Sequence, residues 1–236
     1  TKVLALRGCY HGDTLGAMNA SEPSVFNERQ HPWYTSQGVF LDPPTAALVD
    51  GRWRIDGLFD KRDLFDRDTE YEVDIPDDVG VLLLEPVLMG AGGMIAVDPC
   101  YQRALVRAAR TRGIPVVFDE VFVGMYRLGV ASTRELLGCA PDIACYSKLL
   151  TGGSVPLGAV LARASVFDAF SGDDVRDALL HGHSFTAYPV GCAAALEALR
   201  AYTDLRPAAW SPDLLRGLPG RVVALGAVLA VGLPGE

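Results

Sequence analysis

Two side chains in this sequence have the chemistry and the placement of a reactive pair. Lysine occurs only three times in 236 residues, and Lys148 follows a short apolar run that is typical of a buried strand. Another apolar run, residues 115–118, ends at the acid pair Asp119 and Glu120. A lysine amine can form a Schiff base, and a carboxylate can pair with a protonated pyridine nitrogen. Together these groups predict an enzyme that uses pyridoxal phosphate.

Each member of the pair also has a simpler interpretation. Lys148 has small or apolar neighbours, which favours a desolvated, nucleophilic amine, but the pattern equally fits a surface lysine at the end of a strand. Asp119 either faces a site or caps the turn that follows its strand. In the first role it needs a cation, because breaking a buried ion pair costs about 3 to 5 kcal/mol.

A second group of polar side chains lies at residues 182–186. Its hydroxyls and backbone amides precede the helix expected after Pro189, which suits an anion such as a phosphate. A serine nucleophile elbow is disfavoured, because Thr186 stands where that motif needs glycine. The four histidines lack the spacing of metal ligands, so we assign ordinary structural roles to His11, His31, His181 and His183.

The elements that must position these groups alternate between strand and helix. Apolar runs predict strands at 1–6, 81–84, 116–118 and 142–146. Helical periodicity predicts helices at 99–110 and 189–202, and Asp13 or Thr14 is expected to cap a short helix that ends at Ala20. This order indicates an α/β fold with a mostly parallel central sheet and functional groups at the carboxyl ends of its strands.

Two parts of the chain are organised differently. Residues 22–78 combine prolines, aromatic residues and charges without a clear period, and we assign no elements there. Residues 205–212 carry two prolines and predict a linker. We therefore expect a large domain at 1–205 and the beginning of a smaller α+β domain at 206–236, opened by a hairpin at 221–232.

Composition narrows the function further. Asp and Glu outnumber Lys and Arg by 29 to 21, which argues against nucleic acid and anionic membrane surfaces as partners. The five cysteines are odd in number and form no C-x-x-C pair, so we expect reduced thiols and an intracellular, cytoplasmic-type compartment. No run reaches the roughly 18 apolar residues of a membrane span.

Five motifs, taken in order and spacing, resemble the class III aminotransferases. They are Tyr10-His11-Gly12-Asp13-Thr14, Glu85-Pro86 with residues 90–94, Phe118-Asp119-Glu120-Val121, residues 147–153, and His181-Gly182-His183-Ser184. Within that class the first motif is most similar to the enzymes that make 7,8-diaminononanoate for biotin. Residues 30–34, 40–44 and 222–226 are most similar to the eukaryotic form, which is fused to dethiobiotin synthetase.

The resemblance implies a fold-type I homodimer and a set of roles. Lys148 would bind pyridoxal 5'-phosphate and move a proton, Asp119 would pair with the pyridine nitrogen, and Tyr10 and Val121 would lie against the two faces of the ring. Ser184 stands where most of the family has a phosphate-binding threonine that reaches the neighbouring subunit's site. Glu85 and Arg127 match positions near the substrate, although residues 125–129 depart from the usual Phe-Gly-Arg-Thr-Gly.

The same resemblance implies a reaction and leaves alternatives open. The expected substrates are 8-amino-7-oxononanoate and the amino donor S-adenosylmethionine, in a mitochondrial enzyme. The alternatives are another class III enzyme acting on an ω-amino acid or diamine, and a non-catalytic piece that serves dimerisation. A first phosphate-binding turn is expected before Thr1, and a carboxylate-binding arginine after Glu236.

Overall fold

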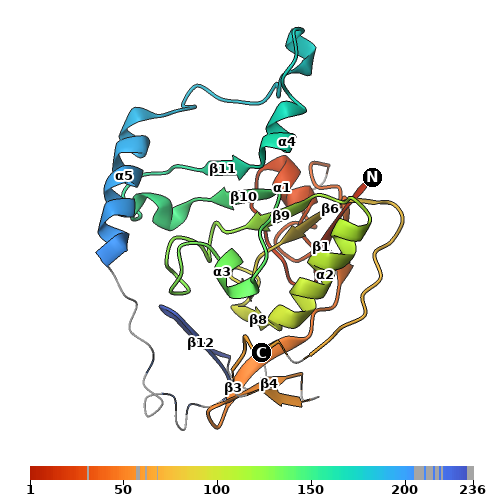
Figure 1. Ribbon diagram of the computed structural model, residues 1–236, viewed down its shortest axis with the longest axis vertical. Coiled ribbons are helices and arrows are strands. Elements are labelled where there is room, and N and C mark those ends of the chain that lie inside the picture. The colour runs from red at the N-terminus through yellow and green to blue at the C-terminus, as the bar shows by residue number, and fades with distance from the viewer. Residues whose placement is uncertain are drawn as a thin grey trace.

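The computed structural model describes residues 1–30, 32–56, 59–61, 63–67, 69–204, 210, 215, 218 and 220–232. Its central feature is a sheet with the strand order β11-β10-β9-β6-β1-β2 (Figure 1). The strands are β1 (Lys2–Leu6), β2 (Gly38–Leu41), β6 (Val79–Leu84), β9 (Val116–Asp119), β10 (Ile143–Tyr146) and β11 (Ala159–Ala162). Every pairing is parallel except that of β10 with β11. The expected mostly parallel α/β sheet is confirmed.

The core of this sheet follows from continuous apolar runs. Leu4, Leu82, Val116 and Phe118 are fully buried, as expected for parallel strands that are covered on both faces. Helix α2 (Pro99–Thr111) packs against β6 and β9. It begins at the N-cap Asp98, with proline at its first position, and it contacts the short helix α3 (Arg134–Leu137).

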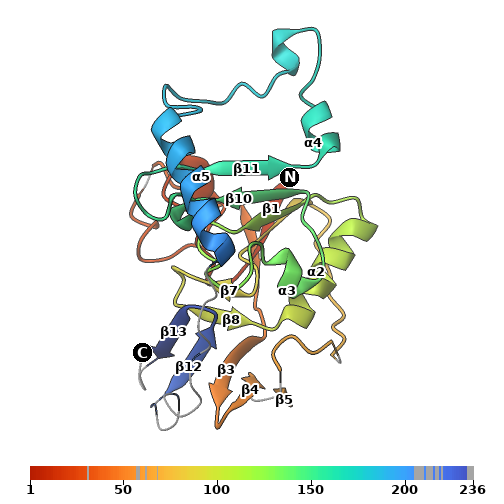
Figure 2. The same ribbon diagram turned by 60° about the vertical axis from the view of Figure 1, so that its left-hand side comes forward.

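A second sheet lies beside the first and includes β3, β4 and β5 from the region left unassigned from sequence, whose remaining strand, β2, belongs to the first sheet. Its main path is β13-β12-β3-β4-β5, and β8 pairs with both β3 and β7. The strands are β3 (Thr45–Val49), β4 (Arg52–Ile55), β5 (Phe59–Lys61), β7 (Leu88–Met89), β8 (Ile95–Val97), β12 (Arg221–Leu225) and β13 (Val228–Gly232). Figure 2 shows the β12–β13 hairpin beside β3. The hairpin expected at 221–232 is confirmed.

The hairpin also contacts the first part of the chain, through its turn. The N–H of Ala227 donates to the carbonyl of Arg127 at 2.8 Å. Gly226 has a φ of +54°, and a Cβ there would lie 2.5 Å from that same carbonyl oxygen. Most of the linker predicted at 205–212 lies outside the described residues, so the division into domains 1–205 and 206–236 stays a prediction.

The remaining helices lie near the amino terminus and after β11. Helix α1 (Leu15–Asn19) begins at Thr14, whose side chain makes no capping hydrogen bond, contrary to the expected cap. After β11 the chain forms α4 (Ala164–Asp168) and the 3₁₀ turn η2 (Val175–Asp177), and it projects away from the sheet before it returns at α5 (Pro189–Asp204) (Figures 1 and 2). Nearly every residue from 160 to 190 is exposed. No helix in the described part of the chain is long and apolar enough to span a membrane.

Candidate active site

The candidate site lies at the edge of the parallel sheet where the strands end. Phe118 pairs with Leu84 on β6, and Asp119 pairs with Cys145 on β10. The carboxyl ends of three neighbouring strands therefore meet at one edge. Asp119 ends β9, and Lys148 follows two residues after the end of β10.

Asp119 is paired with a buried histidine. One carboxylate oxygen lies 2.8 Å from Nδ1 of His11, and the other accepts the N–H of Val121 at 3.1 Å. The Asp119 side chain is 13% exposed, so it reaches the surface of the site. Asp119 therefore caps the turn that follows β9, and its side chain also faces the edge of the sheet where the strands end.

His11 carries the cation that this carboxylate needs. Burial lowers the pKa of His11, but hydrogen bonds to Asp119 and Cys9 outweigh burial and raise its pKa to about 10. The imidazole is therefore protonated at neutral pH. Its Nε2 is buried without a hydrogen-bond partner among the described residues. His11 is thus a buried, hydrogen-bonded side chain, which fits the structural role expected from sequence, and its partner is the carboxylate of the candidate site.

The turn before His11 presents an aromatic ring. Tyr10 is 37% exposed, and its backbone N–H donates to Glu85 at 3.0 Å. The second carboxylate oxygen of Glu85 accepts the N–H of Gly90 at 2.9 Å, and burial raises the pKa of Glu85. Glu85 therefore holds the Tyr10 turn against the loop after β6. Its place near the substrate, implied by the family resemblance, stays a prediction.

Lys148 occupies an unusual backbone conformation. Its φ is +47°, in the left-handed region, and it opens the 3₁₀ helix η1 (Lys148–Thr151). The hydroxyl of Tyr202 on α5 donates to the Leu149 carbonyl at 2.7 Å and so anchors this turn. The Lys148 side chain is exposed, and Nζ lies 6.0 Å from the ring centre of Phe122. The desolvated environment expected for the amine is wrong for this single chain, because no neighbouring element of the described residues covers it.

The other predicted residues divide into two groups. Arg127 stacks over Phe122, with its guanidinium carbon 4.4 Å from the ring centre, and donates from Nε to the Phe122 carbonyl at 2.6 Å; burial lowers its pKa. Val121 is half-buried beside Asp119. Ser184, by contrast, is exposed on the projecting segment and makes no hydrogen bond to the strand edge among the described residues.

Glu120 has a structural role that the sequence did not separate from that of Asp119. It is buried and accepts hydrogen bonds from the Ser132 hydroxyl, the Thr133 N–H and the Tyr146 hydroxyl, at 2.7, 2.7 and 2.9 Å. Strand alternation places the two acids on opposite sides of the chain. Only Asp119 therefore faces the site.

A cavity of about 490 Å³ lies elsewhere. It is lined by residues of β10, β11, α3 and the adjoining loops, without Lys148 or Asp119. The candidate site is thus an open edge in this chain, with an exposed amine, a half-exposed aromatic ring and a carboxylate backed by an imidazolium. These groups suit an aldehyde cofactor that carries a basic ring nitrogen.

Comparison with known proteins agrees with this chemistry. The sequence model described as Aminotransferase class-III matches residues 1–211. The chain belongs to the class III aminotransferase family. The sequence similarity extends over the whole chain, and the predicted family and fold are confirmed.

Three proteins illustrate the range of sequence identity between this chain and its relatives. The mitochondrial bifunctional dethiobiotin synthetase/7,8-diamino-pelargonic acid aminotransferase of Arabidopsis thaliana is 44% identical and covers 100% of this chain, which in turn covers 34% of that protein. The adenosylmethionine-8-amino-7-oxononanoate aminotransferase of Synechococcus elongatus is 33% identical, over 86% of this chain and 46% of its own length. An amine transaminase from an uncultivated Pseudomonas species, crystallised with pyridoxal phosphate, has a TM-score of 0.77 and 27% identity, over 100% of this chain and 56% of its own. The chain spans about a third to a half of the length of these curated relatives.

Proposed function

We propose that this chain forms part of an enzyme that transfers an amino group from S-adenosylmethionine to 8-amino-7-oxononanoate, giving 7,8-diaminononanoate. The observation that carries the proposal is that Lys148 and Asp119 both lie at the carboxyl ends of the neighbouring strands β10 and β9, in a chain 44% identical to a bifunctional enzyme with this aminotransferase activity in its name. The reaction would then be a step in the formation of biotin.

The residues of the site fit pyridoxal 5'-phosphate. When bound, this cofactor supplies an electron sink that stabilises negative charge on the substrate carbon. The Lys148 amine would hold it covalently and, once released, would carry a proton at Nζ between substrate and cofactor carbons. Asp119 would face the ring nitrogen, with His11 holding the carboxylate in place, while Tyr10 and Val121 would lie against the two faces of the ring.

In this proposal Glu85 does not contact the substrate directly, and the substrate is recognised by residues around the cofactor ring. Glu85 would act through Tyr10, whose turn it holds by a backbone hydrogen bond. Arg127 would remain available to a substrate carboxylate through its terminal nitrogens, because only Nε is used in its bond to Phe122. Within the departing residues 125–129, Met125 and Tyr126 have positive φ values of 54° and 67°.

We further propose that the active unit is a homodimer. The projecting segment exposes a series of large apolar side chains, namely Leu161, Phe167, Phe170, Val175, Leu179, Leu180 and Phe185. Exposed apolar surface of this kind marks a protein interface, and a two-fold dimer pairs the same surface of both copies. The partner would cover Lys148, and Ser184 would reach the phosphate in the partner's site. Fusion to dethiobiotin synthetase and a mitochondrial location, both in the name of the Arabidopsis relative, belong to the same proposal.

A spectroscopic half-reaction tests the donor. We expect the purified full-length protein, loaded with pyridoxal phosphate, to lose the absorbance of its lysine-bound cofactor and gain that of pyridoxamine phosphate when S-adenosylmethionine is added. A cofactor band that changes with a simple ω-amino acid or amine but not with S-adenosylmethionine would instead support a different class III reaction. No band at all would favour a non-catalytic role.

A further inference from the structure

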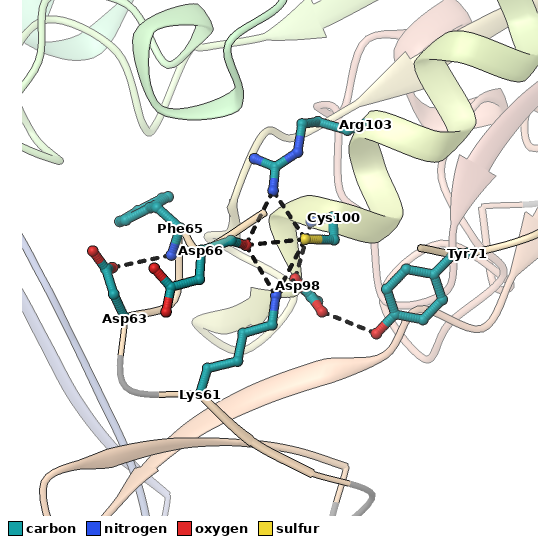
Figure 3. Close-up of polar contacts among 8 residues, drawn as sticks. All are labelled: Lys61, Asp63, Phe65, Asp66, Tyr71, Asp98, Cys100 and Arg103. Atoms are coloured by element: carbon teal, nitrogen blue, oxygen red, sulfur yellow. Dashed lines mark hydrogen bonds and ion pairs between the residues drawn. The ribbon is translucent and has the colours of Figure 1, made fainter. Parts of the chain in front are cut away.

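A second buried polar cluster contains none of the site residues and has no part in the proposed reaction. It joins the end of β5 to the first turn of α2 and is shown in Figure 3. Lys61, Asp98 and Cys100 form its centre, with exposed fractions of 3%, 0% and 2%. Lysine and aspartate are rarely buried unless they are paired, and here the buried pair also encloses a thiol.

The geometry brings the amine and the thiol into direct contact. Nζ of Lys61 lies 3.2 Å from Sγ of Cys100 and 2.9 Å from Oδ1 of Asp98 (Figure 3). The backbone holds both partners in position, because Cys100 donates its own N–H to the same Asp98 oxygen at 2.9 Å. Tyr71 donates its hydroxyl to the other oxygen of Asp98 at 2.9 Å.

The sulfur atom is surrounded by cationic donors. Besides Lys61, the Arg103 guanidinium donates to Sγ at 2.9 Å, and the thiol lies 3.1 Å from the Asp66 carbonyl. Cations beside a cysteine are a common feature of oxidation-sensitive thiols. Burial lowers the pKa of Lys61, but its bonds to Asp98 and Cys100 outweigh burial and raise it, so the resting amine is protonated. Any covalent chemistry at Nζ therefore needs a proton acceptor, and Asp98 is in place.

We propose that Lys61 and Cys100 form an oxidation site at which peroxide joins Nζ to Sγ through one oxygen atom, giving a reversible N–O–S link. A first peroxide oxidises the thiol: its O–O bond breaks, an S–O bond forms, and water leaves. A second peroxide oxidises the amine–sulfenic acid pair: the N–O bond forms and two further waters leave. Overall, one amine, one thiol and two peroxides give one link and three waters, while Asp98 takes the extra proton of the ammonium.

The other cysteines of the chain do not have this arrangement. Among the described residues, Cys100 has a lysine nitrogen within hydrogen-bond distance of its sulfur, and no such contact is seen for the other four cysteines. Cys192 is exposed and serves as a matched control for ordinary thiol oxidation. The link would tie the outer strand of the second sheet to α2, the helix that packs under β6 and β9.

Peptide mapping of the full-length protein after a peroxide titration tests the proposal. We expect a cross-linked pair of peptides containing Lys61 and Cys100, heavier than the sum of the free peptides by about 14 Da, the mass of one oxygen less two hydrogens. Dithiothreitol should restore both free peptides. The pair should persist in Cys192→Ser and disappear in Lys61→Arg and Cys100→Ser.

Two results would overturn the inference. One is oxidation of Cys100 to sulfinic or sulfonic acid with Lys61 unmodified, and the other is a Cys100 that stays reduced while Cys192 is oxidised. Because the cross-linked pair is sought first in the unsubstituted protein, a variant that fails to fold does not affect the conclusion.

Discussion

Replacement of His11 by asparagine gives a prediction with a defined pH dependence. The pKa of His11 is raised from 6.5 to about 10 in the folded protein, since hydrogen bonds to Asp119 and Cys9 outweigh burial. Protonation of His11 therefore stabilises the folded state. This stabilisation is fully present when the pH is below the pKa of the unfolded state, 6.5, and it is lost as the pH rises through the pKa of the folded state, about 10. Asparagine keeps a hydrogen-bonding side chain but carries no charge.

The magnitude follows from the size of the shift. At about 1.36 kcal/mol for each pH unit, protonation of His11 contributes about 5 kcal/mol at pH 6, about 3 kcal/mol at pH 8 and less than about 1 kcal/mol at pH 10. The difference in unfolding free energy between the parent and His11→Asn should therefore shrink steadily across this window. Without the imidazolium, Asp119 keeps only the N–H of Val121 as its described partner.

Urea denaturation of the cofactor-free protein between pH 6 and pH 10 measures this difference. His181→Asn serves as the matched control, because His181 is exposed, and it should leave stability unchanged at every pH. A difference for His11→Asn that is the same at pH 6 and pH 10 would refute the ion pair as its source, whatever its size.

Three further substitutions test how the site is supported. Glu120→Ala leaves two buried donors and one half-buried donor without their acceptor and should cost about 3 to 5 kcal/mol in unfolding free energy, measured by urea denaturation. Tyr202→Phe removes the bond to the Leu149 carbonyl, so we expect a loss of about 1 kcal/mol and about fivefold weaker cofactor retention, measured by dialysis and absorbance. Gly226→Ala should lower the unfolding free energy by about 2 to 4 kcal/mol, because its Cβ would lie 2.5 Å from backbone atoms. Gly51→Ala, at a positive φ of 75° with open space around it, should lower it by only about 1 kcal/mol. Equal losses of stability in the two variants would show that crowding is not the cause.

The parallel sheet could be predicted because its strands are continuous apolar runs. Strands β6, β9 and β10 are enclosed by other elements, so their sequences carry a signal that does not depend on distant residues. In the second sheet the β12–β13 hairpin was predicted, whereas β3, β4, β5, β7 and β8 were missed because they are short and their surface is partly polar. Only β4, in which Arg52 and Arg54 alternate with buried Trp53 and Ile55, carried a period-two signal that could have been recognised.

The candidate site was only partly predictable for a different reason. Lys148 and Asp119 could be found because each follows a strand directly. The partner of Asp119 is 108 residues away in sequence, so its identity as His11 depends on the tertiary fold. The requirement for a cation beside the carboxylate was a signal that could have pointed to His11, which directly follows Tyr10. The exposure of Lys148 depends on what covers the strand edge, which local sequence does not specify.

Trapping of the cofactor on its lysine tests the central claim most directly. The full-length protein would be incubated with pyridoxal phosphate and reduced with borohydride, which makes the lysine–cofactor bond permanent, and the labelled peptide would be identified by mass spectrometry. Of the three lysines in this chain, we expect the label on Lys148 alone and its complete loss in Lys148→Ala. A label on Lys2 or Lys61, or one that persists in Lys148→Ala, would contradict the assignment of Lys148 as the residue that binds the cofactor.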